Sequence, residues 1–212
     1  TRWMFSRVTL FLAQTEEYAE RFRQLGCPGE KVIVTSSLKY DTAEIADTVA
    51  GADDIAHKIA LGDGRLIVFG GTGPGEEKIS LEVFEKLKSN ADNSDLRLAV
   101  VPRKPERFDE VAALIEASGF TYTRYSKLKQ NNSAADGRPD VVLGDTMGDL
   151  KKFYSLADLV FVGRSLVPMG GSDMMESAAM GKCTVFRPHT FNFKKTVRAM
   201  LDGSKTIEIA NN

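Results

Sequence analysis

The sequence predicts an α/β protein built on a doubly wound parallel sheet, and two observations carry this prediction. From residue 65 onward, short apolar runs alternate with segments whose apolar residues recur at helical spacing. Several of these runs end in glycine, as at Gly70 and Gly163, which is typical of a strand that turns sharply toward a helix. Strands that alternate with helices form a parallel sheet covered on both faces, with ligands at the carboxyl ends of the strands.

The start of the chain is predicted to be the tail of a separate β-α-β unit. Val8–Ala13 and Lys31–Thr35 are apolar enough to be strands. The helix between them is expected to begin after Thr15, an N-cap residue followed by two glutamates, and to stop at Gly26. Because the chain begins in the middle of apolar sequence, we expect a larger parent protein.

Three segments divide the chain in this prediction. Residues 1–42 end an N-terminal domain, residues 43–64 are a linker with a helix over Ala43–Ala60, and residues 65–212 form the main domain. Residues 126–139 are polar and are predicted to be a loop. The expected strands are Leu66–Phe69, Leu96–Val101, Phe120–Tyr125, Val141–Leu143, Leu159–Val162, one after Gly181, and Thr206–Ile209. The expected helices are Glu76–Leu87, Glu106–Ala117, Asp149–Ala157, a short one from Ser172 or Asp173 to near Gly181, and Lys194–Leu201.

The composition is that of an ordinary globular protein. Hydrophobic residues make up 42% and charged residues 27%, and the formal net charge of −1 gives no indication of nucleic-acid binding. Cys27 and Cys183 fit neither a zinc motif nor a disulfide framework, so we expect free thiols in a reducing compartment. Only two histidines are present, and we expect no metal and no cofactor. No apolar run is long enough to span a membrane, and no signal peptide is recognised.

The glycine-rich turn GGTGPGEE joins a predicted strand to a predicted helix, so its backbone could approach a phosphate closely. Its spacing differs from the dinucleotide fingerprint. A nicotinamide enzyme would also carry an acid at the end of the next strand to hold a ribose, and this chain has Pro102, Arg103 and Lys104 there. These features argue against NAD. A plain tight turn with Thr72 as the helix cap explains the glycines equally well.

Arg103 is expected to point from a strand end into the ligand crevice. A guanidinium there can make bidentate hydrogen bonds to phosphate or carboxylate, and Pro102 and Pro105 stiffen the turn around it. The alternative is a solvated charge cluster at a helix start. Because basic residues are disfavoured at a helix N-terminus, we favour anion binding.

Two further turns fit either a ligand role or a structural one. Thr146 and Asp149, in GDTMGDL, have the spacing of a capping box. Asp173 and Glu176 have the same spacing, after a Gly-Gly turn that is expected to present backbone N–H groups to an anion. The Glu176 carboxylate could instead bind the two hydroxyls of a ribose.

Six segments of the chain resemble the C-terminal half of 3-deoxy-D-manno-octulosonic acid (Kdo) transferases. They are LFLAQTEEYAERFRQLG, SSLKYD, VPRKPERFDEV, GDTMGDL, FVGRSLVPMGGSDMMESAAMGK and RPHTFNF. They occur in the family's order, and the resemblance extends over nearly the whole chain. The resemblance implies a two-domain glycosyltransferase B fold, with residues 1–42 in the acceptor-side domain and residues 65–212 as the Rossmann-like domain that binds the nucleotide-sugar donor.

The resemblance also implies roles for individual residues. Pro102 and Arg103 match the family's Pro-Arg pair that contacts CMP. The triplet Met147–Asp149 matches Met-Gly-Glu, and the run Asp173–Glu176 matches Asn-Pro-Leu-Glu, whose glutamate holds the ribose. The predicted donor-binding residues are Thr72, Pro102, Arg103, Met147, Gly148, Asp149, Gly170, Gly171, Asp173, Met174, Met175 and Glu176.

Four positions depart from the family pattern. Gly73, Lys104 and Ser172 stand where the family has histidine, and Arg164 stands where it has glycine. The glycine-rich turns that are expected to bind the nucleotide therefore follow the family pattern more closely than the polar side chains that are expected to line the site.

By this resemblance the protein is expected to be an inverting glycosyltransferase that moves Kdo from CMP-Kdo to a lipid A precursor in lipopolysaccharide biosynthesis. The family's catalytic base is a glutamate of the N-terminal domain that lies outside this chain, so the isolated chain is expected to be soluble and inactive. The parent protein is expected to associate peripherally with the cytoplasmic face of the bacterial inner membrane. Two alternatives stay open: a degenerate nucleotide-binding module, and a transferase that uses another nucleotide sugar, such as a UDP-sugar.

Overall fold

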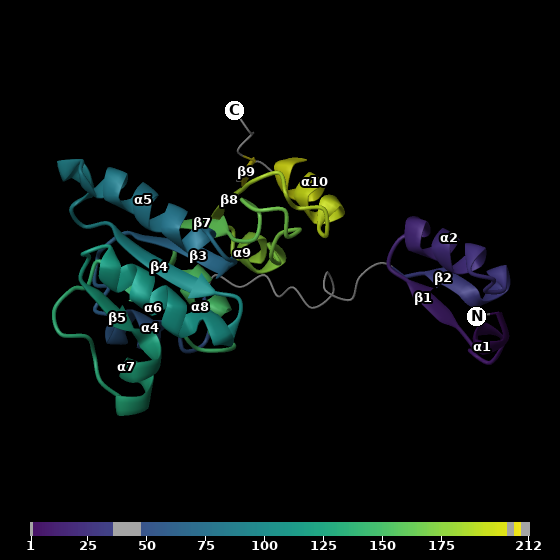
Figure 1. The fold of residues 1–212 in the computed structure, drawn as a ribbon, viewed down its shortest axis with the longest axis horizontal. Coiled ribbons are helices and arrows are strands. Elements are labelled where there is room, and N and C mark those ends of the chain that lie inside the picture. The colour runs from purple at the N-terminus through teal and green to yellow at the C-terminus, as the bar shows by residue number, and fades with distance from the viewer. Residues whose placement is uncertain (1, 36–47, 203–205, 209–212) are drawn as a thin grey trace. The chain divides into compact units, whose positions relative to one another are not determined.

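The computed structural model describes residues 2–35, 48–202 and 206–208 (Figure 1). The chain divides into two compact units, Thr1–Glu44 and Ile45–Asn212. The predicted boundaries at residues 42 and 64 stay a prediction, and residues 43–47 of the predicted linker lie outside the described part of the chain.

The smaller unit is a short α/β segment. Its elements are α1 (Arg2–Ser6), β1 (Phe11–Ala13), α2 (Glu16–Gln24), the 3-10 turn η1 (Gly29–Lys31) and β2 (Val32–Val34). The strands β1 and β2 pair in parallel, as the β-α-β prediction requires. Thr15 caps α2 as predicted, because its hydroxyl accepts a hydrogen bond from the backbone N–H of Tyr18 at 3.2 Å.

One face of this two-stranded sheet is apolar and exposed. Ala13 and Val32 face inward and pack with Ala19 and Cys27. Leu12 and Ile33, which are register partners, face outward and are 62% and 48% exposed. The smaller unit therefore buries only one side of its sheet.

The larger unit is a seven-stranded sheet in the order β5-β6-β4-β3-β7-β8-β9, and every neighbouring pair is parallel. This confirms the predicted doubly wound sheet. Its strands are β3 (Leu66–Thr72), β4 (Arg97–Pro102), β5 (Tyr122–Arg124), β6 (Val141–Leu143), β7 (Leu159–Val162), β8 (Cys183–Phe186) and β9 (Thr206–Glu208). Its helices are α4 (Ala52–Lys58), α5 (Glu76–Lys88), α6 (Phe108–Ala117), α7 (Tyr125–Asn131), α8 (Leu150–Leu156), α9 (Met175–Ala179) and α10 (Lys194–Asp202), with 3-10 turns η2 (Ala91–Asn93) and η3 (Pro105–Arg107).

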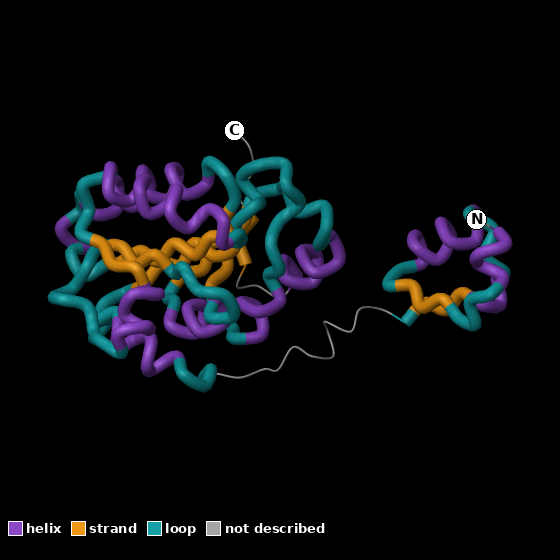
Figure 2. Tube along the Cα trace, turned by 60° about the horizontal axis from the view of Figure 1, so that its bottom comes forward, coloured by secondary structure: helices purple, strands orange, loops and turns teal. Residues whose placement is uncertain are grey.

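Figure 2 shows the sheet between two layers of helices. Successive strand residues point to opposite faces, so each strand contributes to two cores. In β7, Val160 and Val162 join the core that contains α4, α7, α8, α9 and α10, whereas Phe161 joins the core that contains α5 and α6. Burial on both faces explains why these strands are continuous apolar runs.

The prediction that residues 126–139 form a loop is wrong in its first half, because α7 occupies Tyr125–Asn131. Tyr125 and Leu128 are 1% and 7% exposed, and the Tyr125 ring packs edge-on against Phe153. The buried Asp145 carboxylate accepts the backbone N–H of Ser126 at 2.7 Å and so anchors the start of the helix. Two apolar residues one helical turn apart were enough to bury α7 against the core.

The described part of the predicted linker packs into the larger unit. The helix α4 begins at Ala52, and both Ile55 and the following Ile59 are 0% exposed within the core. The free energy gained by burying two isoleucine side chains is about 3–6 kcal/mol. Residues 52–61 therefore belong structurally to the larger unit.

Candidate functional site at the carboxyl edge of the sheet

The order of the strands sets where a ligand crevice is expected. The strand β3 lies between β4 and β7. The chain leaves β3 through α5 toward β4, and it leaves β7 through α9 toward β8, on the other side of the sheet. At such a switch point the two connecting loops diverge, and ligands of open α/β sheets bind there.

The turns after β3 and β7 are joined by the carboxylate of Glu76. This side chain is 0% exposed. It accepts the backbone N–H of Gly73 at 2.9 Å, of Arg164 at 2.5 Å and of Leu166 at 2.9 Å. Three N–H donors offset part of the cost of burying the charge. Glu76, the first of the two adjacent glutamates, therefore holds the turn after β3 and the turn after β7 together.

Several glycines at these turns are required because the loops approach one another closely. A Cβ at Gly70 would stand 2.3 Å from the ring and hydroxyl of Tyr154. A Cβ at Gly71 would stand 2.6 Å from the Ser172 hydroxyl, and one at Gly163 would stand 2.6 Å from the backbone of Thr72. These glycines therefore allow close packing of β3 and its turn against α8 and against the turn after β7, which supports the structural interpretation of the GGTGPGEE turn.

Thr72 does not cap α5, so that part of the prediction is wrong. The residue that caps α5 is Gly75, with φ +90°. The Thr72 hydroxyl donates to the Glu77 carboxylate at 2.8 Å, which also pairs with Arg107 at 2.6 Å. Glu77 is 0% exposed, so this hydrogen-bonded ion pair lies inside the protein.

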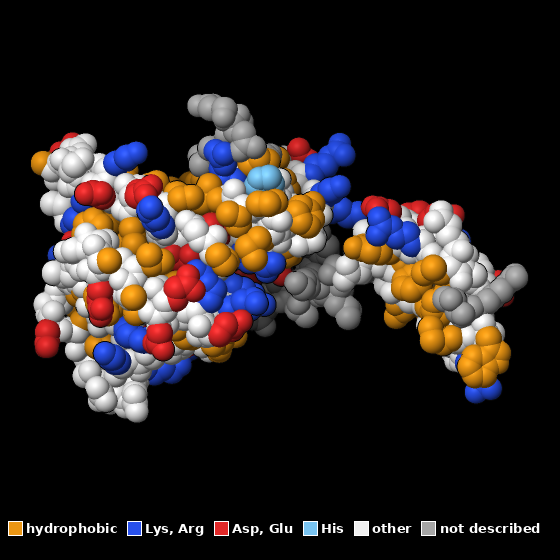
Figure 3. All heavy atoms as spheres, in the orientation of Figure 1, with side chains coloured by type: hydrophobic (Ala, Val, Ile, Leu, Met, Phe, Trp, Pro, Cys, Tyr) orange, Lys and Arg blue, Asp and Glu red, His pale blue; other side chains and the backbone are white. Residues whose placement is uncertain are grey.

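The turn after β4 holds the predicted Pro102 and Arg103. Pro102 is buried at the strand end, and Arg103 is exposed. The backbone N–H of Arg103 donates to the Thr72 carbonyl at 3.1 Å, which fixes this turn beside β3. Among the described side chains none pairs with the Arg103 guanidinium, whereas Lys104 pairs with Glu106 at 3.3 Å. Figure 3 shows Lys and Arg side chains gathered where β3 and β4 finish.

The turn after β6 presents Met147 and Gly148 at the surface. Met147 is 60% exposed, and Gly148 has φ +86°. Asp149 behind them is buried and is the N-cap residue of α8. The capping-box interpretation is wrong, because the Thr146 hydroxyl donates to the Asp149 carboxylate instead of capping a backbone N–H.

Asp149 is held ionised by its neighbours. Burial disfavours its charged form, but hydrogen bonds from Lys129 at 2.7 Å, from Lys152 at 2.8 Å and from Thr146 at 2.8 Å outweigh burial and lower its pKa to about 2. The negative charge at this position is therefore already neutralised within the protein.

The turn after β7 contains Gly170 and Gly171, both buried with positive φ. The N–H of Gly171 donates to the Arg164 carbonyl at 2.8 Å, so this donor is occupied within the turn. The Ser172 hydroxyl donates to the Gly71 carbonyl at 2.7 Å and adds a second tie between the two loops. The backbone N–H groups of Gly170 and Gly171, which were predicted to face an anion together, are therefore not both free.

The helix after this turn is shorter than predicted. It spans Met175–Ala179, with Met174 as N-cap residue, and does not begin at Ser172 or Asp173. Asp173 accepts the backbone N–H of Met175 at 3.0 Å, which is an Asx turn and not a capping box. A helix of five residues has a weak dipole, so the predicted anion site here depends on individual backbone N–H groups more than on the dipole.

Of the run that matches the family motif, Met174 is 0% exposed in the core, while Asp173, Met175 and Glu176 are half-buried. Burial raises the pKa of Tyr154, and the nearby Glu176 and Asp173 carboxylates raise it further. Tyr154 in turn packs against Gly70, at the carboxyl end of β3.

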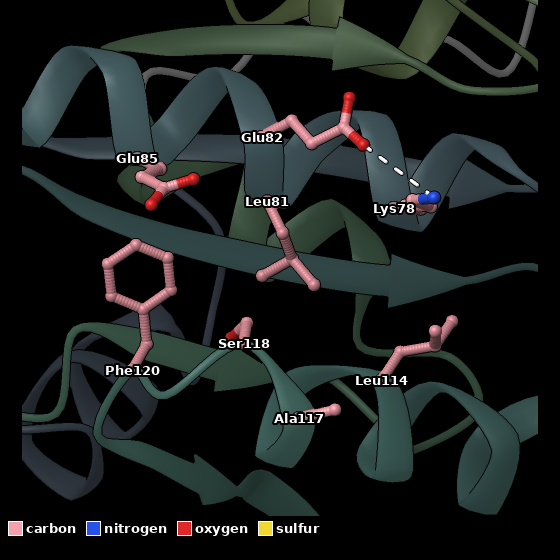
Figure 4. Close-up of a pocket in the computed structure, with 8 residues that line it drawn as sticks. All are labelled: Lys78, Leu81, Glu82, Glu85, Leu114, Ala117, Ser118 and Phe120. Atoms are coloured by element: carbon pink, nitrogen blue, oxygen red, sulfur yellow. Dashed lines mark ion pairs between the residues drawn. The ribbon is translucent and has the colours of Figure 1, made fainter.

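The predicted residues thus come from four neighbouring strand ends, those of β6, β4, β3 and β7. A groove of about 260 Å³ lies elsewhere, between α5 and α6, where Leu81, Leu114 and Phe120 face one another (Figure 4). None of the predicted residues lines it. Within the described residues, no three His, Cys, Asp or Glu side chains are grouped so as to hold a metal. None of the helices in the described part of the chain is long and apolar enough to span a membrane.

The larger unit has the fold of a known donor-binding domain. It matches the crystal structure of the C-terminal CMP-Kdo binding domain of WaaA from Acinetobacter baumannii with a TM-score of 0.66 and 29% sequence identity, over 74% of this chain and 79% of that one. The unit is therefore a C-terminal domain of the glycosyltransferase B fold.

The sequence comparisons identify the family. A family profile described as 3-Deoxy-D-manno-octulosonic-acid transferase (kdotransferase) matches residues 1–42. The 3-deoxy-D-manno-octulosonic acid transferase of Haemophilus influenzae is 32% identical over 206 residues, which are 97% of this chain and 47% of the relative. That of Bordetella pertussis is 36% identical over 193 residues, which are 88% of this chain and 42% of the relative. The chain belongs to the 3-deoxy-D-manno-octulosonic acid transferase family, and it spans about half the length of these curated relatives.

Proposed function

We propose that this chain is the donor-binding part of an inverting Kdo transferase, and that it binds CMP-Kdo at the carboxyl edge of the larger sheet. The observation that carries the proposal is the likeness of the larger unit to a CMP-Kdo binding domain, over most of both chains. Family membership along nearly the whole chain supports it.

The exposed Arg103 is the proposed contact for the CMP phosphate. It has no side-chain partner among the described residues, and its turn is tied to β3 through the Thr72 carbonyl. A preorganised guanidinium stabilises charge that develops on a departing phosphate. A monophosphate carries less charge than a diphosphate, so the proposed reaction needs no metal. The exposed, apolar side chain of Met147 is the proposed contact for the base, and Glu176 the contact for the ribose hydroxyls.

The remaining parts of the reaction are proposed to come from outside this chain. The acceptor would be a lipid A precursor, the catalytic base a glutamate of the N-terminal domain, and the location of the whole protein the cytoplasmic face of the inner membrane. The chain is then expected to bind donor without turning it over. Transfer of Kdo by the isolated 212-residue chain would contradict this assignment of the base.

Calorimetric titration of the chain with CMP tests the proposal. We expect measurable binding that Arg103→Gln weakens about tenfold, because one charged contact is worth about 1.4 kcal/mol. Arg65→Gln is the matched control, since Arg65 precedes β3 at the opposite edge and pairs with Asp95 at 2.6 Å. UMP should compete poorly. Equal binding of UMP would favour a UDP-sugar donor, and absence of CMP binding would contradict the proposal.

A further inference from the structure

Arg164 adopts a backbone conformation that its residue type disfavours. Its φ is +60°, and only Ala60 and Asn132 share a positive φ among the described residues other than glycine. Asn132 is the C-cap of α7 and Ala60 follows the C-cap of α4, positions where left-handed residues commonly end a helix. Arg164 instead follows β7, so its strain has no such explanation.

The surrounding hydrogen bonds hold Arg164 in this conformation. Its N–H donates to the buried Glu76 carboxylate at 2.5 Å, and its carbonyl accepts the N–H of Gly171 at 2.8 Å. Because both backbone groups are fixed, the direction in which the side chain leaves the turn is fixed as well.

The Arg164 side chain crosses to the neighbouring turn. Its Cγ lies 3.2 Å from the place where a Cβ on Gly73 would stand, and the Met169 sulfur lies 2.9 Å from that place. The two side chains therefore fill the space that a side chain at position 73 would need. The residue at position 73 and the Arg164 side chain therefore depend on one another, and the Arg164 side chain lies beside the β3 turn.

The guanidinium has donors that the protein leaves unused. Its Nη2 donates to the Met169 carbonyl at 3.2 Å, and its Nε is buried without a hydrogen-bond partner. No acidic side chain in the described residues pairs with it, and a buried donor without a partner is unfavourable. Arg103 borders the same turn from the β4 side. Arg103 and Arg164 thus border the β3 turn from its two sides, at the switch point of the sheet.

We propose that Arg164 is a specificity residue that binds an oxyanion of the donor beside the β3 turn. The oxyanion is either the carboxylate of an acidic sugar or the phosphate of the nucleotide, since a guanidinium forms bidentate hydrogen bonds with both. This inference rests on the proposed function, because it places Arg164 in the same donor site.

Titrations of the 212-residue chain with CMP and with CMP-Kdo test this inference. Two variants separate binding from folding. Arg164→Gln shortens and neutralises the side chain, whereas Arg164→Gly also relieves the positive φ and is expected to keep or raise the melting temperature. Both variants should lose about tenfold in affinity for the ligand that carries the recognised oxyanion. Arg65→Gln again serves as the control.

The pattern across the two ligands identifies the oxyanion. Weaker binding of CMP-Kdo alone assigns Arg164 to the sugar carboxylate, and weaker binding of both ligands assigns it to the phosphate. Unchanged affinity for both, while Arg103→Gln still weakens CMP binding, would overturn the role of Arg164 and leave the proposed function standing. Absence of CMP binding by the unmodified chain would overturn both.

Discussion

The substitution Glu76→Gln tests whether a buried carboxylate holds the two turns of the candidate site together. The change keeps the size of the side chain and removes its charge. The carboxylate accepts three backbone N–H groups, two on one oxygen and one on the other. Glutamine offers one acceptor oxygen and one NH₂ group, so it cannot satisfy all three donors.

The magnitude follows from these contacts. If the glutamine oxygen keeps the bonds to Gly73 and Arg164, its NH₂ group faces the N–H of Leu166, and that partly buried donor loses its acceptor at a cost of about 1–3 kcal/mol. The two retained bonds weaken because they are no longer charge-assisted. The lower desolvation cost of a neutral side chain offsets part of this loss. We expect a net loss of about 2–3 kcal/mol, or about 4–12 °C in melting temperature for a domain of this size.

Thermal unfolding of the two proteins measures the loss, and amide hydrogen exchange localises it. The N–H groups of Arg164 and Leu166 should exchange faster in the variant, because the turn opens locally. Glu82→Gln is the matched control on the same helix. Its carboxylate is exposed and lies 3.9 Å from Lys78, so its loss should change stability by no more than about 0.5 kcal/mol.

A melting temperature for Glu76→Gln equal to that of Glu82→Gln would refute the reasoning. A loss of stability without faster exchange at Arg164 and Leu166 would also refute it, because the effect would then not act through the turn.

Three further predictions concern the same edge of the sheet. Gly70→Ala should destabilise the protein by about 1–3 kcal/mol in urea unfolding, because the new methyl group would stand 2.3 Å from Tyr154. Arg107→Met should cost about 3–5 kcal/mol, since it leaves the Glu77 carboxylate buried without its ion-pair partner. Asp149→Asn should cost about 1–2 kcal/mol at pH 7, after allowance for the exposure of Lys129, and this cost should vanish in acid. The folded pKa of about 2 lies below the unfolded value of about 4, so the stabilisation is complete above pH 4 and is lost as the pH falls toward 2.

Each of these predictions has a control or a contrary outcome. Gly29→Ala should be neutral, because nothing lies within 4 Å of its Cβ position and its φ is not positive. If Arg107→Met lowered the free energy of unfolding by no more than the loss of an exposed ion pair does, about 1 kcal/mol or less, the internal Arg107–Glu77 pair would not stabilise the turn after β3. A constant difference between the unmodified chain and Asp149→Asn from pH 7 to pH 2 would contradict the assigned pKa.

The strands were the most predictable part of the fold. The predicted strands Val141–Leu143 and Leu159–Val162 match β6 and β7 residue for residue. Each is an apolar run preceded by aspartate and followed by glycine, so the residues on either side mark where the strand begins and ends. The helix α7 was missed because most of its residues are polar. Its two buried residues, Tyr125 and Leu128, belong to a core that includes Phe153 of another helix, and the sequence alone does not show that contact.

The candidate site was predictable as a location but not as a set of contacts. The strand ends and their glycines are visible in the sequence, and Arg103 was singled out by its place at a strand end, its flanking prolines and the resemblance to the family's Pro-Arg pair. The roles of Glu76 and Glu77 were missed, although two adjacent glutamates after a glycine turn were a signal. The partners of Glu76 at Arg164 and Leu166 lie in the turn after β7, far away in the sequence.

The sequence by itself determined the period of the strands and helices, the α/β fold class and the family, because hydrophobic alternation and motif order are local properties of the chain. Only the tertiary structure decided why Gly70 must lack a side chain, which carboxylate joins the β3 and β7 turns, and where the Arg164 guanidinium lies. The physical reason is that these contacts join segments that are distant in the sequence: Gly70 of β3 meets Tyr154 of α8, and the turn after β3 meets the turn after β7. They exist only once the strand order has brought the carboxyl ends of β3 and β7 together.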